Sequence, residues 1–129
     1  MQSTIINDAG NWSYWDAAMR AELEKGRSNF NIGEQVVLEN EQFKVWTIHL
    51  PPNERLPFHI HNTPYLWTVL SRGKARSYFD DGSVKESTYE IGDSMYFEDL
   101  NAEEYFVHDL ENIGDSTLIF TTIEFKKTK

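Results

Sequence analysis

The stretch Phe58-His59-Ile60-His61 lies between a proline-containing turn and a run of strand-forming residues. In a β-strand, residues i and i+2 share a face, so His59 and His61 can direct both imidazole rings to one point. A third histidine, His108, lies in a separate strand-like run. Three imidazoles at one point form a suitable site for zinc, iron, copper or nickel. The stretch therefore predicts a metal centre held by three histidines in a β-rich fold.

Short strand-like runs, parted by turn residues, make up the chain from residue 34 onward. An Asp-Gly pair, Asp81-Gly82, joins two of them and is a hairpin signal. Many short strands without helices between them indicate an antiparallel sandwich or closed barrel. The predicted strands cover residues 34–39, 43–50, 56–61, 65–71, 74–79, 83–89, 94–98, 104–110 and 116–125.

One segment, residues 13–25, has a helical pattern. Ser13 is the expected N-cap, and Gly26 is suited to the position just past the helix end. An apolar stripe at helical spacing predicts that the helix packs on the outside of a sheet. A chain of 129 residues builds one domain. We expect a helix and extension over 1–33 and a β-barrel over 34–129.

Charge and composition restrict the partners. The chain has 12 Lys and Arg against 21 Asp and Glu, a net charge of −9. Nucleic acids and anionic membranes attract clustered Lys and Arg, so we expect neither as a partner. No apolar run approaches the ~20 residues of a membrane-spanning helix. Cysteine is absent, which excludes disulfides and thiolate ligands. The N-terminus lacks the pattern of a secretory signal, so we expect a cytoplasmic location.

The first histidine pair belongs to a pattern that resembles the first motif of the cupins, a family of double-stranded β-helix (jelly-roll) barrels. That motif runs from a Gly through His-x-His and a Glu to a second Gly. Here Asn53 stands at the first Gly, His59 and His61 match the pair, and Gly73 matches the last residue.

The third histidine belongs to a pattern that resembles the second cupin motif. Gly92 opens it, and His108 followed by Asn112 matches its close. The resemblance implies an all-β cupin jelly-roll barrel with one short N-terminal α-helix. It also implies a metal site of His59, His61 and His108.

The chain departs from the first motif at the Glu position, which falls on Leu66 when counted back from Gly73. The sequence then resembles small cupins with three-histidine centres, including diketone-cleaving dioxygenases. It also resembles short cupins of β-alanine catabolism, which have a Tyr where Tyr65 lies, and this implies Tyr65 as a catalytic residue. If Leu66 faces the metal, alternation turns Tyr65 and Trp67 to the opposite surface. An apolar Leu66 beside the metal would favour a neutral or diketone-like ligand.

Glu104 is the candidate to replace the missing carboxylate. It lies four residues before His108, so in a regular strand the two side chains share the interior face. A buried carboxylate is costly unless it is paired or metal-bound. Glu104 is then a ligand or an acid/base group, and the alternative is a solvated carboxylate at the rim. His49 is interpreted as a hydrogen-bonded histidine outside the site.

These observations predict a metal-binding cupin, with Fe²⁺, Zn²⁺ or Ni²⁺, that acts on a small organic molecule in a dioxygenase-like reaction. The alternatives are a non-redox lyase or isomerase, and a non-catalytic ligand-binding cupin. Small cupins commonly dimerise through sheet faces or exchanged N-terminal strands, so the resemblance also implies a homodimer. The residues expected to cover that face are Trp12, Trp15, Val36, Val37 and Leu38.

Overall fold

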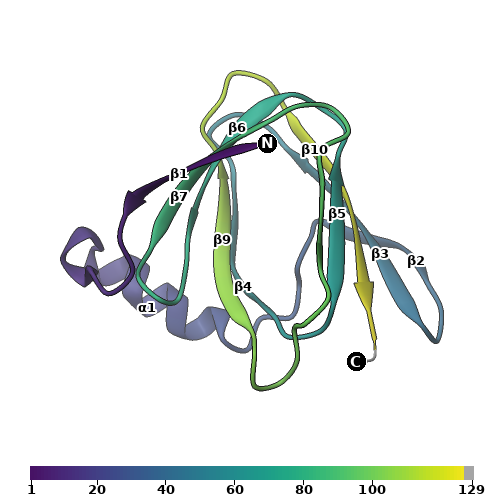
Figure 1. Cartoon of the computed structure of the whole chain (residues 1–129), viewed down its shortest axis with the longest axis horizontal. Helices are drawn as coiled ribbons and strands as arrows, with labels where there is room; N and C mark the ends of the chain where they lie inside the picture. Colours follow the sequence, from purple (N-terminus) through teal and green to yellow (C-terminus); the bar gives the residue numbers. More distant parts are fainter. Residues whose placement is uncertain (127–129) are drawn as a thin grey trace.

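The computed structural model describes residues 1–126 and contains two five-stranded antiparallel sheets that face each other (Figure 1). The first sheet has the order β1 (Gln2–Asn7), β7 (Val84–Tyr89), β6 (Gly73–Tyr78), β9 (Phe106–Asn112) and β4 (Arg55–His61). The second sheet has the order β2 (Gln35–Glu39), β3 (Phe43–Leu50), β10 (Leu118–Phe125), β5 (Tyr65–Val69) and β8 (Ser94–Phe97). This architecture confirms the predicted all-β class.

The nine predicted strands are all present, and each end differs by two residues at most from the predicted end. The pattern did not indicate β1, which pairs only with β7 at the edge of the first sheet. Its side chains are exposed except for Asn7, so no buried face imposes an alternation of polar and apolar residues.

The helical segment begins later than predicted. A 3₁₀ turn, Trp12–Tyr14, precedes helix α1, Ala17–Gly26. Asp16 is the N-cap, and its carboxylate accepts a hydrogen bond from the Met19 amide at 2.8 Å. The expected Ser13 cap is therefore wrong, because Ser13 lies in the 3₁₀ turn.

Helix α1 covers the outer face of the first sheet, as predicted (Figure 1). Leu23 of the helix packs with Trp15, Phe58 and Val107 in a buried cluster. Gly26, the last helical residue, lies so close to β4 that an added Cβ would collide with Phe58. No helix among residues 1–126 is long and apolar enough to span a membrane.

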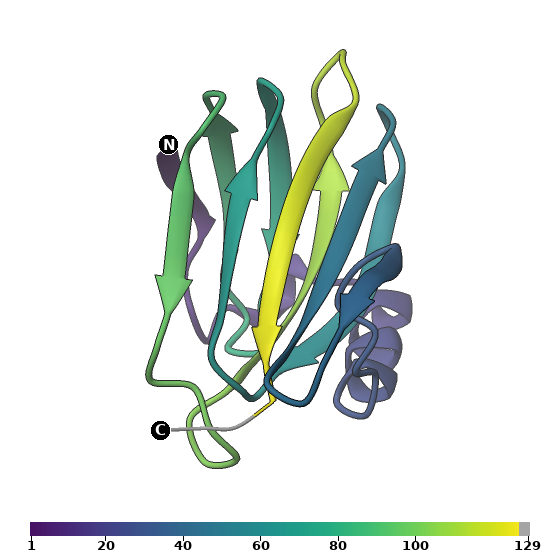
Figure 2. The same cartoon turned by 90° about the vertical axis from the view of Figure 1, so that its right-hand side faces the viewer.

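No helix within residues 1–126 covers the outer face of the second sheet, and Figure 2 shows that face open across β10 and β5. Paired residues form one apolar row across all five strands, which we call the outer apolar row: Leu38, Val45, Ile123, Leu66 and Tyr96.

Trp12 and Trp15 cannot cover that face for a partner, so this part of the expectation is wrong. Trp15 is buried, its ring stacks on Phe58 at 5.7 Å between centroids, and Trp12 packs against the same cluster. Val37 and Leu38 are exposed on β2.

Candidate metal centre

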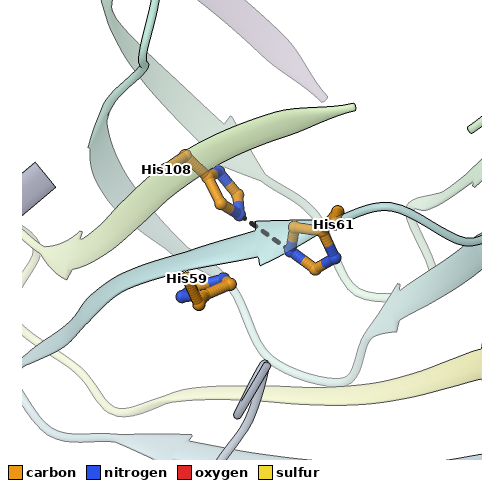
Figure 3. A group of neighbouring side chains, drawn as sticks. All are labelled: His59, His61 and His108. Carbon is orange, nitrogen blue, oxygen red and sulfur yellow. Dashed lines mark hydrogen bonds between the residues drawn. The ribbon is translucent and has the colours of Figure 1, made fainter. Parts of the chain in front are cut away.

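Strands β4 and β9 bring the three histidines together (Figure 3). His59 pairs directly with His108 across the two strands, and His61 lies two residues further along β4. A register shift between Leu56 and His59 adds one residue to β4. Such a bulge re-aims side chains. Phe58 consequently packs toward α1 while His59 lines the interior cavity.

The ring nitrogens of the histidines converge. His61 Nε2 and His108 Nε2 are 3.1 Å apart, and all three ligand nitrogens lie within 4.8 Å of one another. Two nitrogens bound to one zinc ion at about 2.0–2.2 Å are separated by about 2.8–3.6 Å at common coordination angles. The His61–His108 spacing already fits a shared ion, and a small adjustment of His59 completes the set.

His59 has the tautomer that a ligand needs. Its Nδ1–H donates a hydrogen bond to the Pro57 carbonyl at 2.8 Å, which leaves the Nε2 lone pair free. Metal-bound histidines commonly donate their second ring N–H to a carbonyl or carboxylate in this way. The turn before β4 thus orients the first candidate ligand.

Burial also keeps the rings neutral. It lowers the pKa of His59 to about 4, against a weaker opposing effect of the Pro57 carbonyl. Burial, and then repulsion from neighbouring rings, lowers the pKa of His61 and His108 well below 6.5. Neutral imidazole is the form that binds a metal. The three residues therefore fit a divalent transition metal at neutral pH.

A cavity of about 670 Å³ opens onto the three histidines. Tyr65 stacks on the His61 ring with 3.9 Å between centroids, and Phe97 stacks on Tyr65 at 4.9 Å. Burial raises the pKa of Tyr65 well above 10, so its hydroxyl keeps its proton. The site is a mostly apolar chamber with several aromatic residues in its walls and imidazoles on one side.

No family model matches the chain, and no curated protein matches it. Solved structures do. A cupin domain from Bordetella pertussis is 27% identical with a TM-score of 0.62, and the match covers 72% of this chain and 91% of that one. A double-stranded β-helix protein from Klebsiella pneumoniae is 25% identical with a TM-score of 0.55, over 78% and 84%. An RmlC-like cupin from Methanocaldococcus jannaschii is 20% identical with a TM-score of 0.56, over 70% and 76%.

The chain has the cupin fold. Both cupin motifs then have a physical meaning in this structure. Asn53 replaces the first motif's Gly at a positive φ of 68°, a conformation that Asn tolerates better than most residues. Asn112 is fully buried, and its amide donates to the Leu50 and Ser116 carbonyls. The motif Asn therefore ties the barrel together at one end, away from the histidines.

The expected orientation of β5 is wrong, because its alternation is the reverse of the prediction. Tyr65 and Trp67 line the cavity, whereas Leu66 lies on the outer face in the outer apolar row. Pairing with β10 sets this register: Trp67 opposes Thr122, which is buried on the inner face. Leu66 therefore does not face the centre, and its apolar character says nothing about the ligand.

The expected inward orientation of Glu104 is also wrong. Strand β9 begins only at Phe106, and Glu104 lies in the preceding turn. There the Asn101 side chain accepts hydrogen bonds from the Glu103 and Glu104 amides at 2.8 and 3.0 Å. The Glu104 side chain is exposed and does not line the cavity, as the rim alternative expected.

His49, read as a residue outside the site, lies on β3 and contacts Glu34 at 2.8 Å. Three further residues that line the cavity were not predicted from the sequence. Ser77 lies on β6, Phe79 directly follows β6, and Lys85 lies on β7. Alternation along β7 from the buried Tyr89 would have placed Lys85 on the inner face.

Proposed function

We propose that this cupin is a metal-dependent enzyme that acts on a small organic molecule inside the barrel, at a centre held by His59, His61 and His108. The convergence of the His61 and His108 nitrogens at 3.1 Å is the observation that carries the proposal. In the structure these two nitrogens share one hydrogen bond, and a metal ion between the rings would instead engage the lone pair of each neutral imidazole.

Three protein ligands would leave coordination positions open, and a bound Fe²⁺, Zn²⁺ or Ni²⁺ would there polarise a substrate oxygen or activate O₂. The protein supplies the remaining functions. The aromatic walls exclude water from the substrate, and the histidines orient it. The Tyr65 hydroxyl, beside His61, is a hydrogen-bond donor for a substrate oxygen.

We favour a dioxygenase-like reaction over proton-transfer chemistry. Among the described residues that line the cavity, Asp81 is the one carboxylate, and its Oδ1 accepts hydrogen bonds from the Ser83 amide and hydroxyl. A dioxygenase inserts both atoms of O₂ into its substrate and needs no carboxylate base and no further reductant. The shortage of a base beside the histidines supports this choice.

A lyase or isomerase remains the second candidate, because Tyr65 is held in its protonated form next to the histidines. A neutral tyrosine can act as a general acid. In that reaction the product would form without oxygen, and Tyr65→Phe would lower turnover by ~10²-fold or more.

Oxygen uptake tests the proposal. Protein purified without chelator or nickel resin is loaded with Fe²⁺, Zn²⁺ or Ni²⁺ and given small diketones and carboxylic acids. We expect O₂ consumption with one metal and a product that has gained two oxygen atoms, both lost in His61→Ala. Product formed without O₂ would favour the lyase or isomerase. Ligand binding without turnover would make the protein a non-catalytic cupin.

A further inference from the structure

Lys85 is a half-buried cation that lines the cavity. On β7 it pairs with Ser77 of β6 and with Ile5 of β1. Paired residues in antiparallel strands share a face, and both Ser77 and Lys85 line the cavity. Lys85 is half-buried, and a positive charge in a partly enclosed cavity attracts anions. The position therefore suits an anionic group of a ligand.

The described part of the chain shows no carboxylate paired with Lys85. Within residues 1–126, no ion pair includes Lys85, although the chain has a surplus of acidic residues. Asp81, the carboxylate at the cavity, is engaged by Ser83. The other cation at the cavity, the N-terminal ammonium, is neutralised by Asp93 at 2.7 Å. Lys85 is the cavity's available positive charge.

Phe79 connects this charge to the histidines. The Lys85 ammonium lies 4.9 Å from the centroid of the Phe79 ring, and the Phe79 and His108 rings are 5.3 Å apart. The Lys85 charge also contributes to the lowered pKa of His108, after burial and His59. The cation and the candidate metal ligands thus share one chamber and can contact one small molecule.

Serine side chains line the cavity on the same face as Lys85. Ser77 is nearly buried, and no hydrogen-bond partner of its hydroxyl is found in residues 1–126. Because no fully buried polar atom lacks a partner, this hydroxyl opens to the cavity. On the next inward position of β7, the Ser87 hydroxyl bonds to Ser3 at 2.8 Å. An ammonium with a hydroxyl donor beside it matches the two oxygens of a carboxylate.

We propose that Lys85 and Ser77 form a subsite for a carboxylate of the ligand, whose apolar or aromatic body fills the space between them and the three histidines. This inference rests on the proposed function, since it places the substrate in the same cavity. It changes the expected ligand class from a neutral molecule to an organic monoanion. The aromatic walls, including Trp67, Phe97 and Phe106, suit an unsaturated or branched body.

Paired probes test the subsite. Each monocarboxylate from propionate through benzoate to 3-phenylpropionate is compared with its own amide, which has nearly the same shape and no charge. Binding is measured by titration calorimetry at pH 7.5 on the full chain at a fixed, measured metal content. We expect at least one acid to bind about 10-fold or more tighter than its amide, the range of a charged hydrogen bond.

Variants assign that preference to Lys85. We expect Lys85→Met to lose it while amide binding stays within about twofold, and Lys85→Arg to retain it. Lys74→Met, which removes an exposed lysine from the neighbouring strand β6, should keep it. Thermal melts of each variant show that the barrel is folded.

Two results would overturn the subsite. One is equal binding of acid and amide throughout the series by the wild-type protein. The other is an acid preference that survives in Lys85→Met, which would assign the carboxylate to the histidines or their metal. The metal content of each protein distinguishes failure of the subsite from failure of the proposed function. If Lys85→Met keeps the metal content of the wild type, a failed subsite leaves the proposed metal centre intact. A wild-type protein that does not retain metal would instead count against the proposed function.

Discussion

The two faces of the β4–β9 strand pair both carry buried polar groups, but these groups differ in how many of their hydrogen-bond partners the protein provides. On the outer face, Arg55 donates to Asp109 at 2.8 Å and to both oxygens of Glu22 at 2.9 and 2.6 Å. On the inner face, the one hydrogen bond that the His61 and His108 rings make within residues 1–126 joins them to each other, and His59 has one ring nitrogen engaged.

The outer cluster joins α1 to the sheet and is complete within the protein. Burial raises the pKa of Asp109 to about 6, and hydrogen bonds from the Tyr78 amide and Arg55 oppose that rise. Asp109 is therefore charged at pH 7 and matched by Arg55. The inner cluster, in contrast, leaves the Nε2 lone pair of His59 without a hydrogen-bond partner among residues 1–126. We therefore assign a structural role to the paired charges of the outer cluster, and the proposed metal centre to the convergent ring nitrogens of the inner one.

The largest expected effect is on the inner face. His108→Ala should reduce metal affinity by well over the ~10–100-fold that accompanies loss of an outer contact to a ligand. His49→Ala is the matched control, because His49 lies on the outer surface with Glu34 and should leave affinity unchanged. Competition with a chromogenic chelator measures both. Equal affinity in the two variants would remove the functional distinction between the faces.

The outer face should respond in stability and not in metal binding. Arg55→Met leaves Asp109 buried and unpaired, so we expect a loss of about 3 kcal/mol, at the low end for a buried pair because Arg55 is partly exposed. Arg76→Met breaks the more exposed pair with Glu86 and should cost about 1 kcal/mol or less.

Urea denaturation at pH 7.5 provides the comparison between the two arginine variants. Metal affinity of folded Arg55→Met should match the wild type. A similar loss of unfolding free energy in both variants would show that Arg55 contributes no more than an exposed surface ion pair.

A smaller effect is the acid sensitivity of the metal-free protein. The pKa values of the three histidines are lowered in the folded chain, while those of the unfolded chain are near 6.5. Below pH 6.5 the histidines of the unfolded state bind protons, whereas those of the folded state remain neutral. The free energy of unfolding should then fall by up to ~1.4 kcal/mol per pH unit for each histidine, and the effect should vanish above pH 6.5.

Urea denaturation at pH 7.5, 6.0 and 5.0, after chelator treatment, measures that slope. Replacing His59, His61 and His108 together by Gln should flatten it. A triple variant with the same pH dependence as the wild type would mean that these rings are not buried as neutral bases.

The smallest expected effect on the centre comes from Leu66→Glu. Because Leu66 lies on the outer face of β5, metal affinity should stay within about twofold, whereas an inward position would add an anionic ligand and tighten binding. We further propose that the outer apolar row is the contact of a homodimer. Leu66→Glu should then convert dimer to monomer in light scattering, while Lys74→Glu on the first sheet should not. A wild-type monomer would refute the dimer.

Local pattern predicted much of this molecule. The His-x-His spacing on one strand, with His108 in the second motif, predicted a histidine group that the structure brings together. Short apolar runs predicted nine strands because each run has a buried face.

The errors arose where distant pairing decides orientation. Counting from Gly73 placed Leu66 inward, but the β5–β10 register turns it outward. A turn ending at Glu104 interrupts the alternation that His108 would impose. Lys85 was not predicted as a cavity residue, because a single lysine in a strand is expected to be solvent-exposed unless its neighbours in space are known. Strand register and side-chain orientation of this kind depend on distant strands, so no single segment of the sequence predicts them.

X-ray absorption at the metal edge, on protein purified without chelator or affinity-tag nickel, tests the histidine centre most directly. We predict one metal per chain, with three imidazole nitrogens at about 2.0–2.2 Å, and loss of both metal and imidazole scattering in His61→Ala. A metal-free protein that also fails to take up Fe²⁺, Zn²⁺ or Ni²⁺, or a bound metal without imidazole scattering, would contradict it.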